Sequence, residues 1–276
     1  MLRQRVITAL ILAPLVMAGV IWLDTRVLAL LLGGVILLGG WEWGALAGFT
    51  TSRGRAGYLA LLLLLLIAAA YLATRNGSLW LLLPALAGWL LAAAWVVAYQ
   101  RSAGRRPAEP GLLAMRLIGV AVLVPPWLAL VTVHHSGAVG PQLMLFLLVL
   151  IWTADSGAYF AGRRFGRRKL AAYVSPGKSM EGVAGALLLG GLFALACGAA
   201  LGYAGADLLA FVLLGLATVL VSVLGDLFES LIKRYRSVKD SGGLLPGHGG
   251  VLDRVDSLTA AAPFFAVGMA WLGSGA

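Results

Sequence analysis

Long apolar stretches separated by short polar connections run through this chain from beginning to end. Each is close to the roughly 20 residues that a helix needs to cross the hydrocarbon core of a bilayer. The stretches are Val6–Leu23, Val27–Phe49, Tyr58–Ala73, Leu79–Tyr99, Leu112–Val133, Gln142–Ala161, Val183–Leu201, Leu208–Leu231 and Leu258–Gly273. The pattern therefore predicts an all-α, polytopic integral membrane protein with about nine transmembrane helices.

The first stretch follows Arg3 and Arg5, as the apolar part of a secretory signal peptide would. It lacks a cleavage pattern of small residues, and further stretches of similar length follow it, so we expect a membrane helix. The single cysteine, Cys197, lies in an apolar stretch. This excludes a disulfide framework and a cysteine metal cluster.

Composition and charge support this interpretation. Only 12% of the 276 residues are charged and 61% are hydrophobic, whereas a soluble domain carries about 25% charged residues. If the N-terminus is cytoplasmic, nine spans place every lysine and arginine except Arg26 and Arg75 on the cytoplasmic side. This is the positive-inside bias, and it supports nine spans with a cytoplasmic N-terminus. We expect an integral protein of the cytoplasmic (inner) membrane, with its site facing the cytoplasm. The basic residues are dispersed and not interleaved with aromatic residues, so we expect no nucleic-acid partner.

The polar residues divide the chain into two regions. We expect N-terminal membrane helices in residues 1–140 and a catalytic membrane region with cytoplasmic polar loops in residues 141–276. Eight of the eleven acidic residues lie between positions 155 and 256. A purely structural membrane protein has no reason to collect carboxylates there.

Two carboxylates lie inside or beside predicted spans, where a charge is costly and usually functional. Asp155 lies near the cytoplasmic end of the sixth span, and we expect it to be functional. Glu42 lies between Trp41 and Trp43 in the second span. The tryptophans fit interfacial anchoring as well as function, so the role of Glu42 stays open.

The end of the eighth predicted span carries several candidate site residues. On a helix, Asp226, Glu229 and Lys233 lie three and four residues apart and share one face with Ser230. An ion-paired helix end is the alternative interpretation of this stripe.

Asp253 and Asp256 lie three residues apart and project together if a helix begins there. Neighbouring carboxylates repel each other unless a proton or a cation lies between them. Mg²⁺ needs one or two carboxylates plus substrate phosphate oxygens, and Asp226, Asp253 and Asp256 could supply them from two helix ends. Capping of the last helix explains Asp253 alone.

Residues 239–250 between these carboxylates hold five glycines and a proline. Glycine lets a ligand approach the backbone, and successive N–H groups can cradle phosphate oxygens. Basic residues that can neutralise a polyphosphate surround this loop: Lys233, Arg234, Lys239 and Arg254. His248 either contacts a phosphate, takes part in proton transfer or stabilises the loop.

A second polar segment, Ser175-Pro-Gly-Lys-Ser-Met-Glu181, offers Ser175, Lys178 and Glu181 as phosphate or nucleotide contacts. It is not a Walker A loop, whose glycine and lysine spacing is absent.

The stretch Ser230-Leu-Ile-Lys-Arg-Tyr-Arg-Ser-Val-Lys-Asp-Ser-Gly-Gly-Leu-Leu-Pro-Gly-His-Gly-Gly-Val-Leu-Asp-Arg-Val-Asp256 resembles the signature of the phosphatidate cytidylyltransferase family. Asp155-Ser-Gly-Ala-Tyr-Phe-Ala-Gly-Arg and Ser175-Pro-Gly-Lys-Ser-Met-Glu-Gly are similar to further blocks of that family. The resemblance covers Trp152 to Ser257.

This resemblance implies an enzyme that joins CTP and phosphatidic acid into CDP-diacylglycerol and releases pyrophosphate. It also implies dependence on Mg²⁺, alone or with a second cation, and a homodimer. The implied metal ligands are Asp226, Asp253 and Asp256, and the implied catalytic residues are these three with Lys233 and Lys239. The implied nucleotide site holds Ser175, Lys178, Glu181, Ser230, Arg234, Asp240, His248, Gly249, Gly250 and Arg254.

Two other functions fit parts of the sequence. A transporter or channel would place charges near the bilayer midplane and repeat its two halves, whereas these charges cluster at one face and no repeat is visible. A CTP-using lipid or polyprenol kinase would release CDP, and an enzyme of the resembled family would release pyrophosphate.

Overall fold

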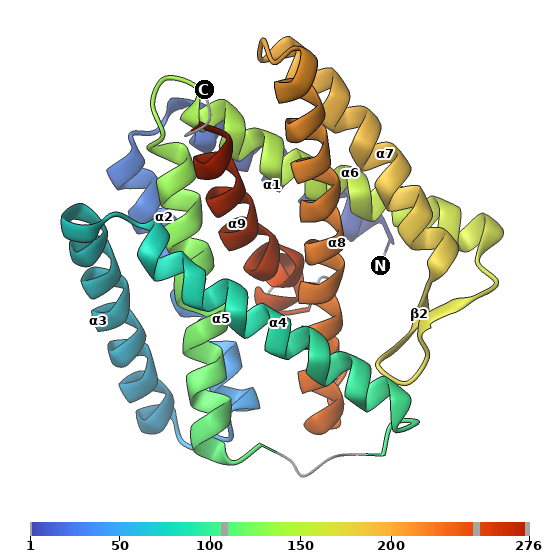
Figure 1. Cartoon of the computed structure of the whole chain (residues 1–276). Helices are drawn as coiled ribbons and strands as arrows, with labels where there is room; N and C mark the ends of the chain where they lie inside the picture. The colour runs from blue at the N-terminus through green and yellow to red at the C-terminus, as the bar shows by residue number, and fades with distance from the viewer. Residues whose placement is uncertain (1, 106–109, 245–248, 274–276) are drawn as a thin grey trace.

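Helices make up most of the backbone in the computed structural model, which describes residues 2–105, 110–244 and 249–273 (Figure 1). The helices are α1 (Leu2–Trp22), α2 (Thr25–Leu46), α3 (Ser52–Asn76), α4 (Leu79–Arg101), α5 (Leu112–His134), α6 (Gly140–Phe165), α7 (Met180–Ala200), α8 (Gly205–Tyr235) and α9 (Leu252–Gly273). In the described part of the chain, the eight helices α2 to α9 are long and apolar enough to cross a membrane. In α1 the described apolar part is shorter, Leu10–Trp22. The predicted all-α polytopic fold is confirmed.

Two helices extend beyond the apolar stretches that predicted them, and both extensions carry polar residues. Helix α8 continues past the predicted end at Leu231 to Tyr235, and α9 begins at Leu252, ahead of the predicted start at Leu258. Hydropathy marks only the segment that sits in hydrocarbon, while helical hydrogen bonding continues into polar sequence. As a result, the candidate residues of 230–234 and 253–256, which flank the glycine-rich loop, lie on regular helix.

The connections predicted to be cytoplasmic lie together at one end of the helix bundle. The side chain of Arg236, after α8, donates from Nε to the carbonyl oxygen of Leu46 at the end of α2, at 2.5 Å. The backbone N–H of Tyr173, between α6 and α7, donates to Oε1 of Gln100 at the end of α4, at 3.0 Å. The first contact joins the polar ends of α8 and α2, and the second joins the α6–α7 connection to the polar end of α4. The predicted alternation of spans places all of these segments on the same side.

The opposite end of the bundle joins connections from the other predicted side. The buried His134, at the end of α5, contacts Oγ1 of Thr25 through Nδ1 at 2.8 Å. Its Nε2 lies 2.9 Å from the carbonyl oxygen of Val20 near the end of α1. The connections predicted for the two sides of the membrane therefore meet in separate groups at opposite ends of the bundle.

A short β-hairpin, which the sequence pattern did not predict, connects α6 to α7. Strands β1 (Lys169–Ala171) and β2 (Ser175–Ser179) pair in antiparallel register, with Lys169 opposite Ser179. Ser179 then begins α7, where its Oγ accepts a hydrogen bond from the N–H of Gly182 at 3.1 Å. The hairpin carries Lys178 away from the α7 axis and toward α8.

Helix α9 lies in the middle of the bundle, where it packs against α8, α5 and α4 (Figure 1). Its Ala260, Ala261 and Ala262 have no exposed surface, because small residues allow close helix packing inside a membrane protein. Helices from both sides of residue 140 thus surround α9, and the division of the chain there stays a prediction.

Candidate functional site

The face of α8 near its polar end carries the central part of the site. Glu229 and Ser230 lie three and four residues after Asp226, and Lys233 lies four and three residues after them on this helix. Residues so spaced lie on one side of a helix and can contact one another. Lys233 Nζ accordingly lies 3.1 Å from Glu229 Oε1, and Ser230 Oγ donates to Asp226 Oδ1 at 3.3 Å. The four side chains thus lie on one face as two interacting pairs, and the Glu229–Lys233 pair also fits an ion-paired helix end.

Lys233 also joins α8 to the first turn of α9. Its ammonium nitrogen lies 2.6 Å from Oδ1 of Asp253. The side chains of Lys233, Glu229 and Asp253 are 13%, 7% and 8% exposed, so this charge cluster is almost withdrawn from solvent. Buried charges of this kind depend on one another, because removing one partner leaves the others uncompensated.

Asp253 binds both ends of the glycine-rich loop as well as Lys233. Its Oδ2 accepts from the N–H of Ser241 at 3.0 Å and from the N–H of Gly250 at 2.8 Å. Gly249, just before, has a φ of +80°, and a Cβ there would lie 2.8 Å from Asp253 Oδ2. A side chain at position 249 would therefore be strained and would push against the carboxylate.

Asp226 pairs with the β-hairpin through its second carboxylate oxygen. Lys178 Nζ lies 2.6 Å from Asp226 Oδ2, with the two side chains 25% and 31% exposed. This pair is more open to solvent than the Lys233 cluster, so a ligand can compete for it. The contact links residues far apart in the sequence and places β2 against α8.

Asp256 lies close to Asp226 because α8 and α9 touch at a glycine. A Cβ on Gly225 would lie 2.5 Å from the backbone oxygen of Asp256. Asp226 acts electrostatically on both Asp256 and Asp155, and Lys178 lies within the same range. The exposed side chain of Asp155 on α6 thus lies near Asp226, and its functional role stays a prediction.

Several predicted site residues lie around this cluster. Arg234 Nε donates to the carbonyl oxygen of Val174 in the hairpin at 3.0 Å. Lys239, Asp240 and Arg254 are exposed, and Ser175 is half-buried at the start of β2. His248 lies outside the described residues.

Glu181 occupies a different place from Lys178, although the same short motif contains both residues. Its Oε2 accepts from the backbone N–H groups of Arg167 and Arg168 at 3.0 and 3.2 Å. These two hydrogen bonds hold the base of the hairpin. The assignment of Glu181 as a nucleotide contact stays a prediction.

The carboxylates offer ligands for a hard cation such as Mg²⁺. Within the described parts of the chain, no three His, Cys, Asp or Glu side chains are grouped as ligands of one metal ion. Asp226 and Asp256 nevertheless repel each other across the α8–α9 contact, and two carboxylates completed by substrate phosphate oxygens suffice for Mg²⁺. The carboxylate oxygens of Asp253 instead bind Lys233 and the loop N–H groups, so the assignment of Asp253 to a shared metal site stays a prediction.

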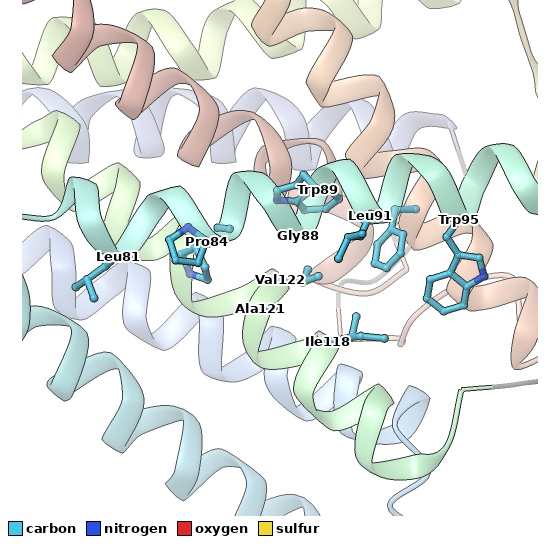
Figure 2. Close-up of a pocket in the computed structure, with 13 residues that line it drawn as sticks. Leu81, Pro84, Gly88, Trp89, Leu91, Trp95, Ile118, Ala121 and Val122 are labelled. Atoms are coloured by element: carbon cyan, nitrogen blue, oxygen red, sulfur yellow. The ribbon is translucent and has the colours of Figure 1, made fainter.

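A cavity of about 440 Å³ lies between α4, α5 and α8, away from these charges (Figure 2). Trp89 and Trp95 of α4 line it, and Phe228 closes it from α8. Phe228 lies two residues from Asp226, and residues so spaced do not share a helix face. The lining has no charged side chain, so this cavity suits hydrocarbon and not a nucleotide.

The sequence left two site features unassigned. Glu42 reaches the glycine-rich loop from α2, where the N–H groups of Val251 and Leu252 donate to its carboxylate. Ser241 joins the same contact through its hydroxyl, at 3.3 Å from Glu42 Oε2. The only signal in the sequence was the high cost of a carboxylate within a predicted span.

Comparison with known proteins matches this chain along nearly its whole length. A model of the Cytidylyltransferase family matches residues 3–272. A curated protein of Pseudomonas aeruginosa named "Phosphatidate cytidylyltransferase" is 46% identical over 266 residues, which are 96% of each chain. A protein of the same name from Haemophilus influenzae is 40% identical over 96% of this chain and 97% of its own.

The similarity is not confined to the signature region. A Bacillus subtilis protein of that name is 42% identical over 49% of each chain. The longer matches extend well before Trp152, where the signature-like region begins, and therefore include the N-terminal helices. By the extent of the family match and the identity to full-length relatives, this chain belongs to the cytidylyltransferase family.

Proposed function

We propose that this protein transfers the cytidylyl group of CTP to phosphatidic acid, giving CDP-diacylglycerol and pyrophosphate. The observation that carries the proposal is the pair of lysines that contact carboxylates of α8 and α9. Lys178 forms an ion pair with Asp226, and Lys233 forms ion pairs with Glu229 and Asp253 beside the glycine-rich loop. Family membership and the names of the relatives support the same reaction.

The two lysines suit different tasks because their exposure differs. Lys178 is the more exposed, so it can exchange Asp226 for a phosphate oxygen of CTP. Lys233 is held on both sides by carboxylates and fixes the end of α8 against the start of α9. In this proposal Lys178 therefore binds substrate directly. Lys233 holds the end of α8 against the start of α9 and adds positive charge to the site.

The reaction requires positioning and neutralisation of charge more than proton transfer. A phosphate oxygen of phosphatidic acid, already ionised at neutral pH, attacks the α-phosphorus of CTP. The new phosphorus–oxygen bond forms as the bond to the bridging oxygen of the β-phosphate breaks, and its electron pair leaves with pyrophosphate. Positively charged side chains and loop N–H groups stabilise the charge that develops on the phosphoryl oxygens. No general base is needed, so we assign no proton-transfer role to His248.

Asp226 and Asp256 would hold Mg²⁺ in this proposal, with phosphate oxygens of CTP completing its ligands. The ion would reduce the repulsion between the two anionic substrates and stabilise pyrophosphate as it leaves. Asp155, which interacts electrostatically with Asp226, lies close enough to influence the same phosphates. A second cation remains part of the proposal.

We place the site at the cytoplasmic face of the inner membrane. The proposal rests on the positive-inside bias and on the cytosolic supply of CTP. The polar ends of α2, α4 and α8 meet there, and the apolar helices beside them contact lipid. The homodimer implied by the family resemblance belongs to the same proposal, and the mass of the protein in detergent tests it.

The first experiment uses purified, detergent-solubilised protein with phosphatidic acid, labelled CTP and Mg²⁺. CDP-diacylglycerol and pyrophosphate are followed together, with EDTA as one control and Asp226→Asn as the other. We expect both products, and we expect both controls to abolish them. Appearance of CDP with a phosphorylated lipid would instead identify a kinase, and absence of any CTP turnover by folded protein would refute the proposal.

A further inference from the structure

Glu42 is a buried carboxylate that the proposed reaction does not use. It lies near the end of α2 and is only 3% exposed. A charged group at such a site must be compensated by hydrogen bonds or opposite charge, because the cost of burying it is otherwise several kcal/mol. The hydrogen-bond donors around the Glu42 carboxylate indicate its structural role.

Among the described residues, three donors contact this carboxylate, two from the segment that joins α8 to α9 and one from the first residue of α9. The N–H of Val251 donates to Oε1 at 3.0 Å, and the N–H of Leu252 donates to Oε2 at 2.9 Å. The hydroxyl of Ser241 donates to Oε2 at 3.3 Å. These partners lie about two hundred positions away in the sequence.

The contact satisfies the start of α9 from outside the helix. Leu252 is the first residue of α9, and the first N–H groups of a helix have no partner within it. A negative charge at this end also interacts favourably with the helix dipole. Glu42 therefore acts as an N-terminal cap supplied by another helix.

Glu42 and Asp253 hold the two ends of the glycine-rich loop together. At the beginning of the loop, the hydroxyl of Ser241 donates a hydrogen bond to Glu42 and its N–H donates to Asp253. At the end of the loop, the N–H of Gly250 donates to Asp253 and the N–H of Val251 donates to Glu42. The loop is thus closed by two carboxylates, of which only Asp253 belongs to the charge cluster on α8.

The fit around Glu42 leaves no space for a side chain at two positions of the loop. A Cβ on Gly242 would lie within van der Waals overlap of Glu42 Oε1, and one on Gly250 would lie 2.5 Å from Oε2. The two glycines therefore let the loop backbone lie directly on the carboxylate.

We propose that Glu42 is a positioning residue for cytidylyl transfer, which closes the glycine-rich loop and sets the start of α9. Through that start it fixes Asp253 against Lys233 and Asp256 beside Asp226. This inference rests on the proposed function for its kinetic consequence. Its structural consequence, the closure of the loop, does not.

Glu42→Gln is the most informative variant because it keeps the size of the side chain. The amide nitrogen cannot accept a hydrogen bond, so it faces at least one N–H donor that it cannot satisfy. We expect kcat/KM for CTP to fall by about 10–100-fold, the range typical of residues that orient a ligand-binding shell. The KM for phosphatidic acid should stay near the wild-type value, and Glu42→Asp should recover part of the loss.

Thr25→Val is the matched control. Thr25 also lies on α2 and makes a partly buried contact across helices, to His134, but at the opposite end of the bundle. We expect it to lower stability without changing kcat/KM per folded molecule. If Glu42→Gln lost activity only in proportion to its folded fraction, as this control would, the positioning role would be refuted.

Hydrogen exchange of two backbone amides tests loop closure without any substrate. The N–H groups of Ser241 and Gly250 are bonded to Asp253 and not to Glu42. If Glu42 sets the loop, these amides should exchange faster in Glu42→Gln and at the wild-type rate in Thr25→Val. Unchanged exchange in Glu42→Gln would overturn the inference even if the enzyme proved to catalyse another reaction.

Discussion

Substituting Lys233 by methionine should destabilise the protein, because two buried carboxylates interact with this one ammonium group. Lys233 Nζ lies 3.1 Å from Glu229 and 2.6 Å from Asp253. Asp253 keeps the N–H groups of Ser241 and Gly250 when the lysine is removed. Glu229 keeps nothing, since Lys233 is its only hydrogen-bond partner within the described residues.

The expected cost follows from that difference. Removing one partner of a buried ion pair costs about 3–5 kcal/mol, because the remaining charge is left uncompensated. At about 1.4 kcal/mol per factor of ten, the ratio of folded to unfolded protein falls by roughly 100-fold or more. Most of this loss is assigned to Glu229, whose side chain is 7% exposed.

A second substitution separates charge burial from loss of catalysis. Lys233→Met with Glu229→Gln replaces the uncompensated carboxylate by a neutral amide, whose unpaired cost is about 1–3 kcal/mol. We expect the double variant to recover about 2 kcal/mol of stability relative to Lys233→Met, taking the difference of those costs. Its activity should stay as low as that of the single variant, because the lysine is still missing.

The assay is equilibrium unfolding of the detergent-solubilised protein, followed by tryptophan fluorescence, beside cytidylyl transfer under native conditions. Lys233→Met within about 1 kcal/mol of wild type would contradict the buried-charge argument. A double variant no more stable than Lys233→Met would show that Glu229 is not the group left uncompensated.

Three further predictions follow from the same contacts. Lys178→Met should change the free energy of unfolding by less than about 1 kcal/mol, because its pair with Asp226 is partly exposed, but should abolish CTP turnover in the product assay. Gly225→Ala should cost about 1–3 kcal/mol by overpacking α8 against α9, and thermal unfolding should show no such loss for Gly88→Ala, where the added methyl meets nothing within 4 Å. Asp256→Asn should raise the Mg²⁺ concentration needed for half-maximal activity, and EDTA should stop turnover reversibly.

The positions of the membrane helices along the chain could be predicted from the sequence, because they depend on local composition. Apolar length and the side on which arginine and lysine fall are properties of neighbouring residues. The same holds for the stripe from Asp226 to Lys233, since helical spacing alone brings those side chains together. The family signature likewise marks Asp253 and Asp256, because it is a pattern of residues along the chain.

The tertiary structure alone decided which of these residues contact one another. Lys178 meets Asp226 only because a hairpin that no pattern predicted turns β2 toward α8. Glu42 meets the glycine-rich loop only because α2 packs beside the start of α9, with about two hundred residues between them in the chain. Such contacts depend on how whole helices pack and not on spacing within one helix. The sequence therefore determined the membrane fold and most of the candidate site residues, whereas helix packing decided which carboxylates bind lysine and which hold the loop.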